Sequence, residues 1–140
     1  MIRKLRPAAR YLGLDPSPYA VERFGKSRNV RRGSFAELGE LRRRAPFDLI
    51  VCSDALHYVP DEDVRKGMPH LVALLGGVAY LEVLTTDDDI VGDLEGWHAR
   101  PARWYRRAFE AAGLTSCGMQ CWAGAAAAER LSALERPAVV

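Results

Sequence analysis

The stretch "ARYLGLDPSPYAVERFG", residues 9–25, decides the fold, because an apolar strand in it runs into an acid and then straight into a helix. "RYLGLD" (10–15) has the composition of a strand, and Ser17 followed by Pro18 is a typical helix start. We expect this helix to end at Gly25. Asp15 therefore stands at the carboxyl end of a buried strand, where unpaired carboxylates rarely serve stability.

The rest of the chain alternates strands with helices. The patterns predict strands over 29–33, 47–53 and 78–84, helices over 34–44, 61–75 and 101–112, and a closing antiparallel pair over 114–122 and 129–137. "FDLIVCS" (47–53) is nearly all apolar, as expected for a strand buried on both faces. Asp61 is expected to cap the third helix, Pro69 to kink it, and Gly76 with Gly77 to end it.

This alternation predicts one α/β domain over residues 1–140, with a mostly parallel sheet and an antiparallel closing strand. In such sheets, ligands bind beyond the carboxyl ends of the strands. The residues that directly follow each strand are therefore the candidates for function.

Composition bounds the class of protein. A chain of 140 residues that is 49% hydrophobic and 27% charged is typical of a soluble globular domain. No apolar run approaches the roughly 18–20 residues of a membrane helix, and the N-terminus lacks a secretory signal pattern, so we expect a cytoplasmic protein. The three cysteines have no CxxC spacing, which argues against a disulfide framework and against a metal site.

Charge is unevenly distributed. Residues 1–44 carry 12 basic and 4 acidic side chains, whereas residues 45–100 carry 3 basic and 11 acidic ones. The basic part raises the question of nucleic acid, but its arginines alternate with apolar helix positions, so solvated helix faces are favoured. The acidic segment "TTDDDIVGDLEGWH" (85–98) has two interpretations: attraction of a cationic or amine ligand, or a solvated loop, which is favoured.

Three strand ends carry polar or reactive side chains, and each has a plain structural alternative. Asp15 can cap the helix that follows it. Ser34 can be the N-cap of "SFAE", which has the form of a capping box. His57 can be an exposed loop histidine. The order and spacing of the three together are a stronger signal than any one of them.

At these positions the chain resembles the class I S-adenosylmethionine-dependent methyltransferases. The matching stretches are "YLGLDPSPYAVE", "VRRGSFAEL", "FDLIVCSDALHYVPDEDV", "LLGGVAYLEV" and "WYRRAFEAAGL". The resemblance implies a Rossmann-like sheet, S-adenosyl-L-methionine as cofactor, and a small-molecule methyl acceptor. It implies no membrane partner.

The resemblance also implies roles for individual residues. Asp15 would accept both ribose hydroxyls of the cofactor as charge-assisted bonds. Pro16 would lie against the adenine, Ser34 and Phe35 at its edge, and Cys52 and Ser53 along the methionine part. Asp54, Tyr58, Trp97 and His98 would line the acceptor site. His57 is the candidate general base, because the usual pKa of histidine suits proton transfer near neutral pH.

Two departures from the family pattern stand out. The family usually has an acid at the position of Ser34 to bond the adenine amino group. Its first strand and glycine-rich turn should precede Asp15 by roughly twenty residues, but only fourteen residues precede Asp15, and no GxG exists anywhere in the chain. We therefore expect the central first strand to be missing, between the strands that end at Asp15 and Ser53. A missing N-terminal segment, or self-association, would complete the sheet.

Two other functions stay open. A degenerate methyltransferase fold without catalysis would serve as a binding or interaction module, which the loss of the glycine turn favours. A nicotinamide-dependent Rossmann enzyme also places an acid after its second strand. The closing strands and "WYRRAFEAAGL" (104–114) disfavour it.

Overall fold

The computed structural model describes residues 8–41, 46–92 and 94–131. Its strands are β1 (Gly13–Asp15), β2 (Val30–Arg32), β3 (Phe47–Ser53), β4 (Leu75–Glu82), β5 (Thr115–Gly118) and β6 (Cys121–Ala123). Its α-helices are α2 (Pro18–Arg28), α3 (Asp61–Leu74), α4 (Ala102–Ala111) and α5 (Ala125–Ala128), and its 3₁₀ helices are η1 (Phe35–Glu40) and η2 (Leu56–Tyr58). None of the described helices is long and apolar enough to cross a membrane.

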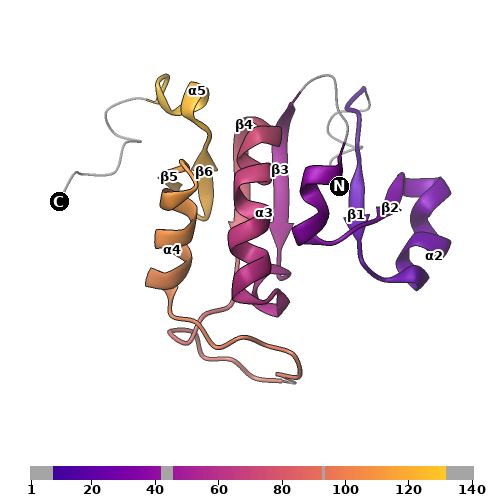
Figure 1. Cartoon of the computed structure of the whole chain (residues 1–140), viewed down its shortest axis with the longest axis horizontal. Coiled ribbons are helices and arrows are strands. Elements are labelled where there is room, and N and C mark those ends of the chain that lie inside the picture. Colours follow the sequence, from indigo (N-terminus) through magenta and orange to yellow (C-terminus); the bar gives the residue numbers. More distant parts are fainter. Residues whose placement is uncertain (1–7, 42–45, 93, 132–140) are drawn as a thin grey trace.

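The strands form two separate sheets (Figure 1). β1 and β2 pair in parallel, and a second sheet has the order β3-β4-β6-β5. β3 runs parallel to β4, whereas β6 is antiparallel to both β4 and β5. The predicted antiparallel closing strand is confirmed. The expected absence of a central strand is also confirmed for the described residues, because none of their strands pairs with both β1 and β3.

The core lies on one face of the four-stranded sheet. α3, α4 and η1 cover this face, and the predicted apolar positions of α4 point into it, with Tyr105 and Phe109 each 2% exposed. Phe109 meets Trp122 of β6 edge-on, with 5.1 Å between the ring centroids. The core therefore joins the helical layer to β4 and β6.

The opposite face of β3 is open. Ile50 and Cys52 pack against the core, but the alternate side chains Leu49 and Val51 are 48% and 53% exposed. The prediction that 47–53 is buried on both faces is therefore wrong. The apolar composition of β3 suits a strand covered on both faces, but the described helices cover only one face of it.

The boundary between α3 and β4 also differs from the prediction. Gly76 and Gly77 do not separate the two elements, because they lie inside β4. A Cβ on Gly77 would stand 2.2 Å from the Asp48 carbonyl oxygen, so glycine is required where β4 approaches β3. α3 begins after Pro60, and Asp61 is its first residue rather than its cap.

The C-terminal prediction is wrong in its details. Residues 114–122 contain both β5 and the start of β6, joined by Met119 and Gln120, which have φ angles of 49° and 62°. Both angles suit a two-residue hairpin turn. Gln120 is held there because its carbonyl accepts from the Leu81 N–H at 2.9 Å. Residues 129–131 are not in a strand, and 132–137 lie outside the described residues.

Smaller differences concern the N-terminal third. α2 continues past Gly25 to Arg28 and ends at Asn29, whose φ of 51° is left-handed. The helix predicted from residue 34 is the 3₁₀ helix η1, which ends before Leu41, and 42–44 lie outside the described residues. β1 covers only the last three residues of the predicted strand 10–15. These ends depend on tertiary contacts that periodicity does not report.

Gly67 of α3 allows η1 to pack closely on the helix. A Cβ on Gly67 would stand 2.5 Å from the Phe35 carbonyl oxygen and 2.4 Å from its ring. We expect Gly67→Ala to destabilise the fold by about 1–3 kcal/mol, because backbone atoms of η1 would have to move. Urea unfolding followed by circular dichroism measures this. Lys66→Ala, on the exposed side of the same helix, is the matched control and should change stability by less than about 0.5 kcal/mol. Equal effects of the two substitutions would contradict the close packing.

Candidate active site

Asp15 ends β1, as predicted, and only part of its carboxylate is used locally. Its Oδ1 accepts from the Ser17 N–H at 2.8 Å, so Asp15 does cap the turn into α2. Among the described residues its Oδ2 has no hydrogen-bond partner. Pro16 is exposed beside it. The capping role and a ligand-binding role are therefore compatible, because each uses a different oxygen.

Ser34 follows β2 and begins η1 in a capping box, as its spacing predicts. Its N–H donates to Glu37 Oε2 at 2.7 Å, and this bond lowers the pKa of the exposed Glu37 carboxyl. A cavity of about 390 Å³ adjoins the pair and is lined by Leu14, Arg32, Gly33, Ser34, Glu37, Glu40 and Leu41. The fold thus brings the Glu37 carboxylate next to Ser34.

The carboxyl ends of β3 and β4 meet in register, with Ser53 opposite Glu82. The Ser53 hydroxyl donates to the Glu82 carboxylate, and the Asp54 N–H donates to the Glu82 carbonyl oxygen at 3.2 Å. Asp54 has a φ of 52°, so the chain turns sharply there. Sequence reasoning missed Glu82; its signal is an acid that ends an otherwise apolar strand.

Cys52 directs its side chain away from this edge, toward the core. Burial raises the pKa of the Cys52 thiol to about 11, so it stays protonated at neutral pH. Only its backbone is available to a ligand at the strand end.

His57 lies in η2 and is fully buried, so it is not the exposed loop histidine of the plain alternative. Its Nδ1 accepts from the Leu84 N–H at 3.1 Å, and its carbonyl oxygen accepts from the His98 N–H at 2.8 Å. Burial lowers the pKa of the imidazole, with Asp54 raising it and Arg100 lowering it further. His57 therefore joins the ends of β3 and β4 to the segment that carries Trp97.

Residues 85–92 and 94–100 belong to the loop between β4 and α4, which lies below these strand ends in Figure 1. Trp97 and His98 are half-buried, and Tyr58 is 48% exposed. A Cβ on Gly96 would lie 4.0 Å from the Tyr58 ring, which places the two predicted acceptor segments side by side. No hydrogen bond among the described residues links Asp15 to this group.

Arg100 organises the loop, and sequence reasoning missed it. It is 4% exposed and donates to the Leu56 carbonyl at 3.1 Å, the Val59 carbonyl at 2.6 Å and Asp61 Oδ1 at 2.7 Å. Its guanidinium also lies 4.4 Å from the centroid of the Trp104 ring. The Arg100 side chain thus contacts three elements: η2, the start of α3, and α4. No local sequence pattern predicts this role.

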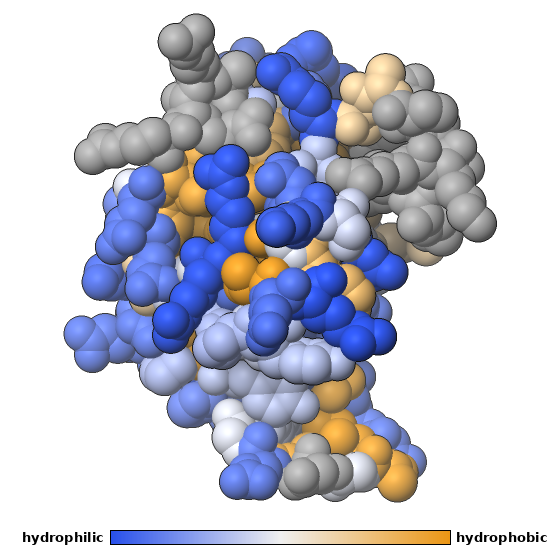
Figure 2. All heavy atoms as spheres, turned by 90° about the vertical axis from the view of Figure 1, so that its right-hand side faces the viewer, coloured by the Kyte–Doolittle hydropathy of each residue, from blue (hydrophilic) through white to orange (hydrophobic). Residues whose placement is uncertain are grey.

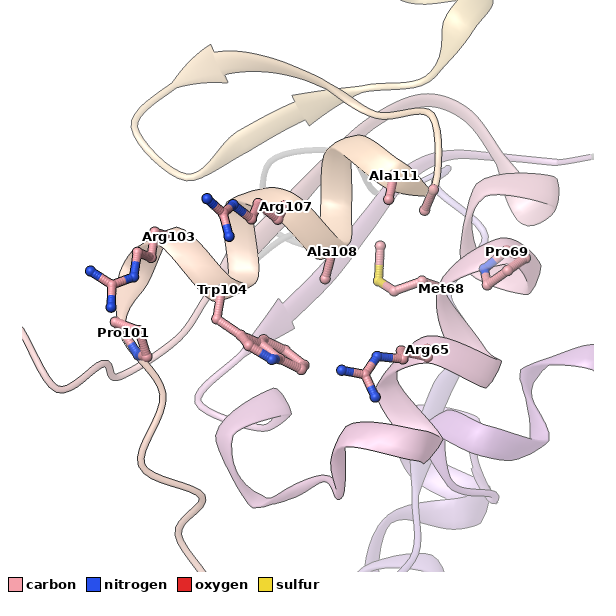
Figure 3. Close-up of a pocket in the computed structure, with 10 residues that line it drawn as sticks. Arg65, Met68, Pro69, Pro101, Arg103, Trp104, Arg107, Ala108 and Ala111 are labelled. Carbon is pink, nitrogen blue, oxygen red and sulfur yellow. The ribbon is translucent and has the colours of Figure 1, made fainter.

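Another groove lies between α3 and α4 (Figure 3). It has a volume of about 610 Å³ and contains Arg65, Met68 and Trp104 but none of the predicted site residues. The strand ends carry the polar groups that can perform chemistry, so we place the candidate site there.

A further surface bears on the predicted partners. Figure 2 shows the face that carries α2 and β2, where hydrophilic side chains predominate with apolar surface between them. Arg28 stacks on Phe24 of its own helix, 4.6 Å from the ring centroid. Within the described ranges, no group of three or more His, Cys, Asp or Glu side chains is placed to hold a metal ion.

A sequence profile described as a methyltransferase domain matches residues 1–78. The chain therefore belongs to the methyltransferase-domain family, whose cofactor is S-adenosyl-L-methionine. No curated protein matches the chain by sequence.

Solved structures support the same fold. The chain resembles an O-methyltransferase from a trans-AT PKS multienzyme of Brevibacillus brevis in complex with S-adenosyl-L-homocysteine, at TM-score 0.61 and 12% identity over 82% of this chain. It also resembles CalO1, a methyltransferase in calicheamicin biosynthesis, at 0.54 and 19% over 88%, and LaPhzM at 0.56 and 16% over 87%. It spans only 41%, 43% and 43% of these three chains. The likeness shows the class I methyltransferase fold.

Proposed function

We propose that this chain is part of an S-adenosylmethionine-dependent methyltransferase that acts on a small molecule. The observation that carries the proposal is Asp15, at the carboxyl end of β1, with one carboxylate oxygen that bonds to none of the described residues. It occupies this position in a chain of the methyltransferase-domain family. Neighbours of the same fold were crystallised with S-adenosyl-L-homocysteine.

The residues at the strand ends fit the cofactor in chemical type. Asp15 accepts ribose hydroxyls, and exposed Pro16 offers an apolar surface to adenine. Ser34 lines the 390 Å³ cavity, and Phe35 follows it as the first residue of η1. The Ser53 hydroxyl and the Cys52 backbone border the methionine part. When bound, the cofactor supplies an activated methyl group, so the chain has to align the acceptor and exclude water.

The acceptor side of the site consists of Asp54, His57, Tyr58, Trp97 and His98. In the neutral imidazole the Leu84 N–H bond occupies Nδ1, so His57 acts as a general base only if that bond breaks. Asp54, at the sharp turn after β3, is an alternative group for removing a proton from the acceptor.

The domain is incomplete over the described residues, and we propose that a strand from outside them inserts between β1 and β3. Both strands offer unpaired edges there, and Leu49 and Val51 leave an apolar face for a helix to cover. The inserted segment would also bring the glycine-rich turn. An N-terminal segment of a longer polypeptide or a partner chain would supply it.

Calorimetric titration of the purified chain with S-adenosyl-L-homocysteine tests the proposal. We expect saturable binding when the inserted strand is present, supplied by a longer polypeptide or a partner chain, so that the sheet is complete. For the chain alone, sedimentation velocity should show self-association through the open strand edges. A folded, monomeric chain that does not bind would favour the second candidate, a non-catalytic interaction module. The observation that favours this second candidate is the open edge itself.

Glu37 gives a sharper test of the adenine end. We expect Glu37→Gln to weaken binding of S-adenosyl-L-homocysteine about tenfold, because it removes the charge that stands in for the acid missing at Ser34. Glutamine also serves in a capping box, so the fold should persist. Glu40→Gln is the matched control, since Glu40 lines the same cavity without bonding Ser34. Equal affinities of the two variants, measured by the same titration, would refute this role.

A further inference from the structure

Two buried N–H groups beside the strand ends have no acceptor. They are His57 Nε2 and Trp97 Nε1, and neither has a hydrogen-bond partner among the described residues. An unsatisfied buried donor costs free energy, and native proteins tolerate few of them without a functional or solvent explanation. Two on neighbouring segments therefore point to acceptor atoms that the described residues do not supply.

The proton of His57 is on Nε2. Nδ1 accepts from the Leu84 N–H, so in the neutral ring Nε2 carries the hydrogen. The ring is fully buried, which favours its neutral form. His57 therefore presents a donor at Nε2, as Trp97 always does at Nε1.

The two donors belong to segments that lie against each other. The His98 N–H donates to the His57 carbonyl at 2.8 Å, and the Gly96 position lies against the Tyr58 ring. Trp97 stands between these two contacts. The segment that carries it is anchored at its start, where the Thr86 N–H donates to the Arg100 carbonyl at 2.9 Å.

We propose that His57 Nε2–H and Trp97 Nε1–H donate to oxygen atoms of the methyl acceptor, of the carboxylate or phenolate class. The inference rests on the proposed function and names the substrate class for that site. Two donors attract an oxygen that accepts hydrogen bonds. They disfavour an ammonium group, because its nitrogen has no lone pair with which to accept a hydrogen bond. The acceptor is therefore an oxygen-bearing molecule rather than the amine suggested by the acidic loop.

The experiment follows the indole N–H resonance of Trp97 by NMR in the full chain labelled with ¹⁵N-tryptophan. Trp97→Phe assigns this resonance among the three tryptophans. Sodium formate is the probe, and methylammonium chloride at equal ionic strength is its counterpart. We expect formate to shift the resonance saturably and methylammonium to leave it unchanged.

His57→Asn removes Nε2–H, while its side-chain oxygen can still accept from the Leu84 N–H. We expect it to weaken formate binding about three- to tenfold. His70→Asn is the matched control and should leave binding unchanged, because His70 is exposed on α3 and belongs to none of the proposed binding residues. Should His57→Asn not fold, the contrast between formate and methylammonium in the unsubstituted chain still decides.

The inference is overturned if formate gives no saturable shift, which would mean water alone occupies the position, or if methylammonium shifts the resonance equally. Titration with S-adenosyl-L-homocysteine separates this from the proposed function. A formate effect without cofactor binding, in a preparation whose sheet is complete, would refute methyl transfer but keep the donor pair. Cofactor binding without a formate effect would refute the donor pair alone.

Discussion

Replacing Arg100 with alanine is expected to lower the free energy of unfolding by about 3–5 kcal/mol. The side chain is 4% exposed, and its removal takes away the donor that Arg100 supplies to the Val59 carbonyl and to the Tyr105 hydroxyl. It also removes the cation that stacks on Trp104. Urea unfolding followed by tryptophan fluorescence measures the change.

Two companion substitutions sharpen this expectation. Arg100→Lys keeps the charge but cannot reach Asp61, Leu56 and Val59 together, so it should recover less than half of the loss. Arg65→Ala is the matched control. Arg65 is 67% exposed and stands 3.8 Å from the same Asp61, so its loss should cost less than about 1 kcal/mol. If Arg65→Ala proves as harmful as Arg100→Ala, exposure and fork geometry do not explain the role of Arg100.

Replacing Asp15 with alanine is expected to weaken binding of S-adenosyl-L-homocysteine at least about 100-fold. Under the proposed function this carboxylate accepts two ribose hydroxyls, and hydrogen bonds to a charged group contribute about 1.5–3 kcal/mol each. Calorimetric titration of both proteins measures the two dissociation constants to be compared. A change of less than about threefold would leave Asp15 with its local role only.

That local role needs its own control, because Asp15 also caps the turn into α2. Asp15→Asn keeps an oxygen for the Ser17 N–H and loses the charge, so it should retain the fold and lose most of the affinity. Ser17→Ala removes the side-chain acceptor of the Ala20 N–H and leaves the carboxylate, so it should retain the affinity. The opposite pattern would assign Asp15 to helix capping.

Much of the fold was predictable because its signals are local. The alternation of apolar runs with capped helical segments predicted β3, α3 and α4 within a few residues, and the absent GxG predicted the break between β1 and β3. The candidate residues at the strand ends follow from the same rule, since parallel strands bring their carboxyl ends to one edge. Glycine placement misled at Gly76 and Gly77, because both lie inside β4, and at Gly77 the close approach of β3 requires the residue.

By itself, the sequence determined β3, α3 and α4, their order, and the acid that ends β1, because capping, periodicity and turn chemistry act over a few residues. Only the tertiary structure decided that Glu37 folds back onto Ser34 and that Arg100 joins three elements across a separation of up to 44 residues. It also decided that His57 is buried and that its donor nitrogen finds no acceptor in the described part of the chain. These features depend on contacts between segments distant in the chain, and a side chain's partner and burial are properties of the packed interior rather than of its neighbours in sequence.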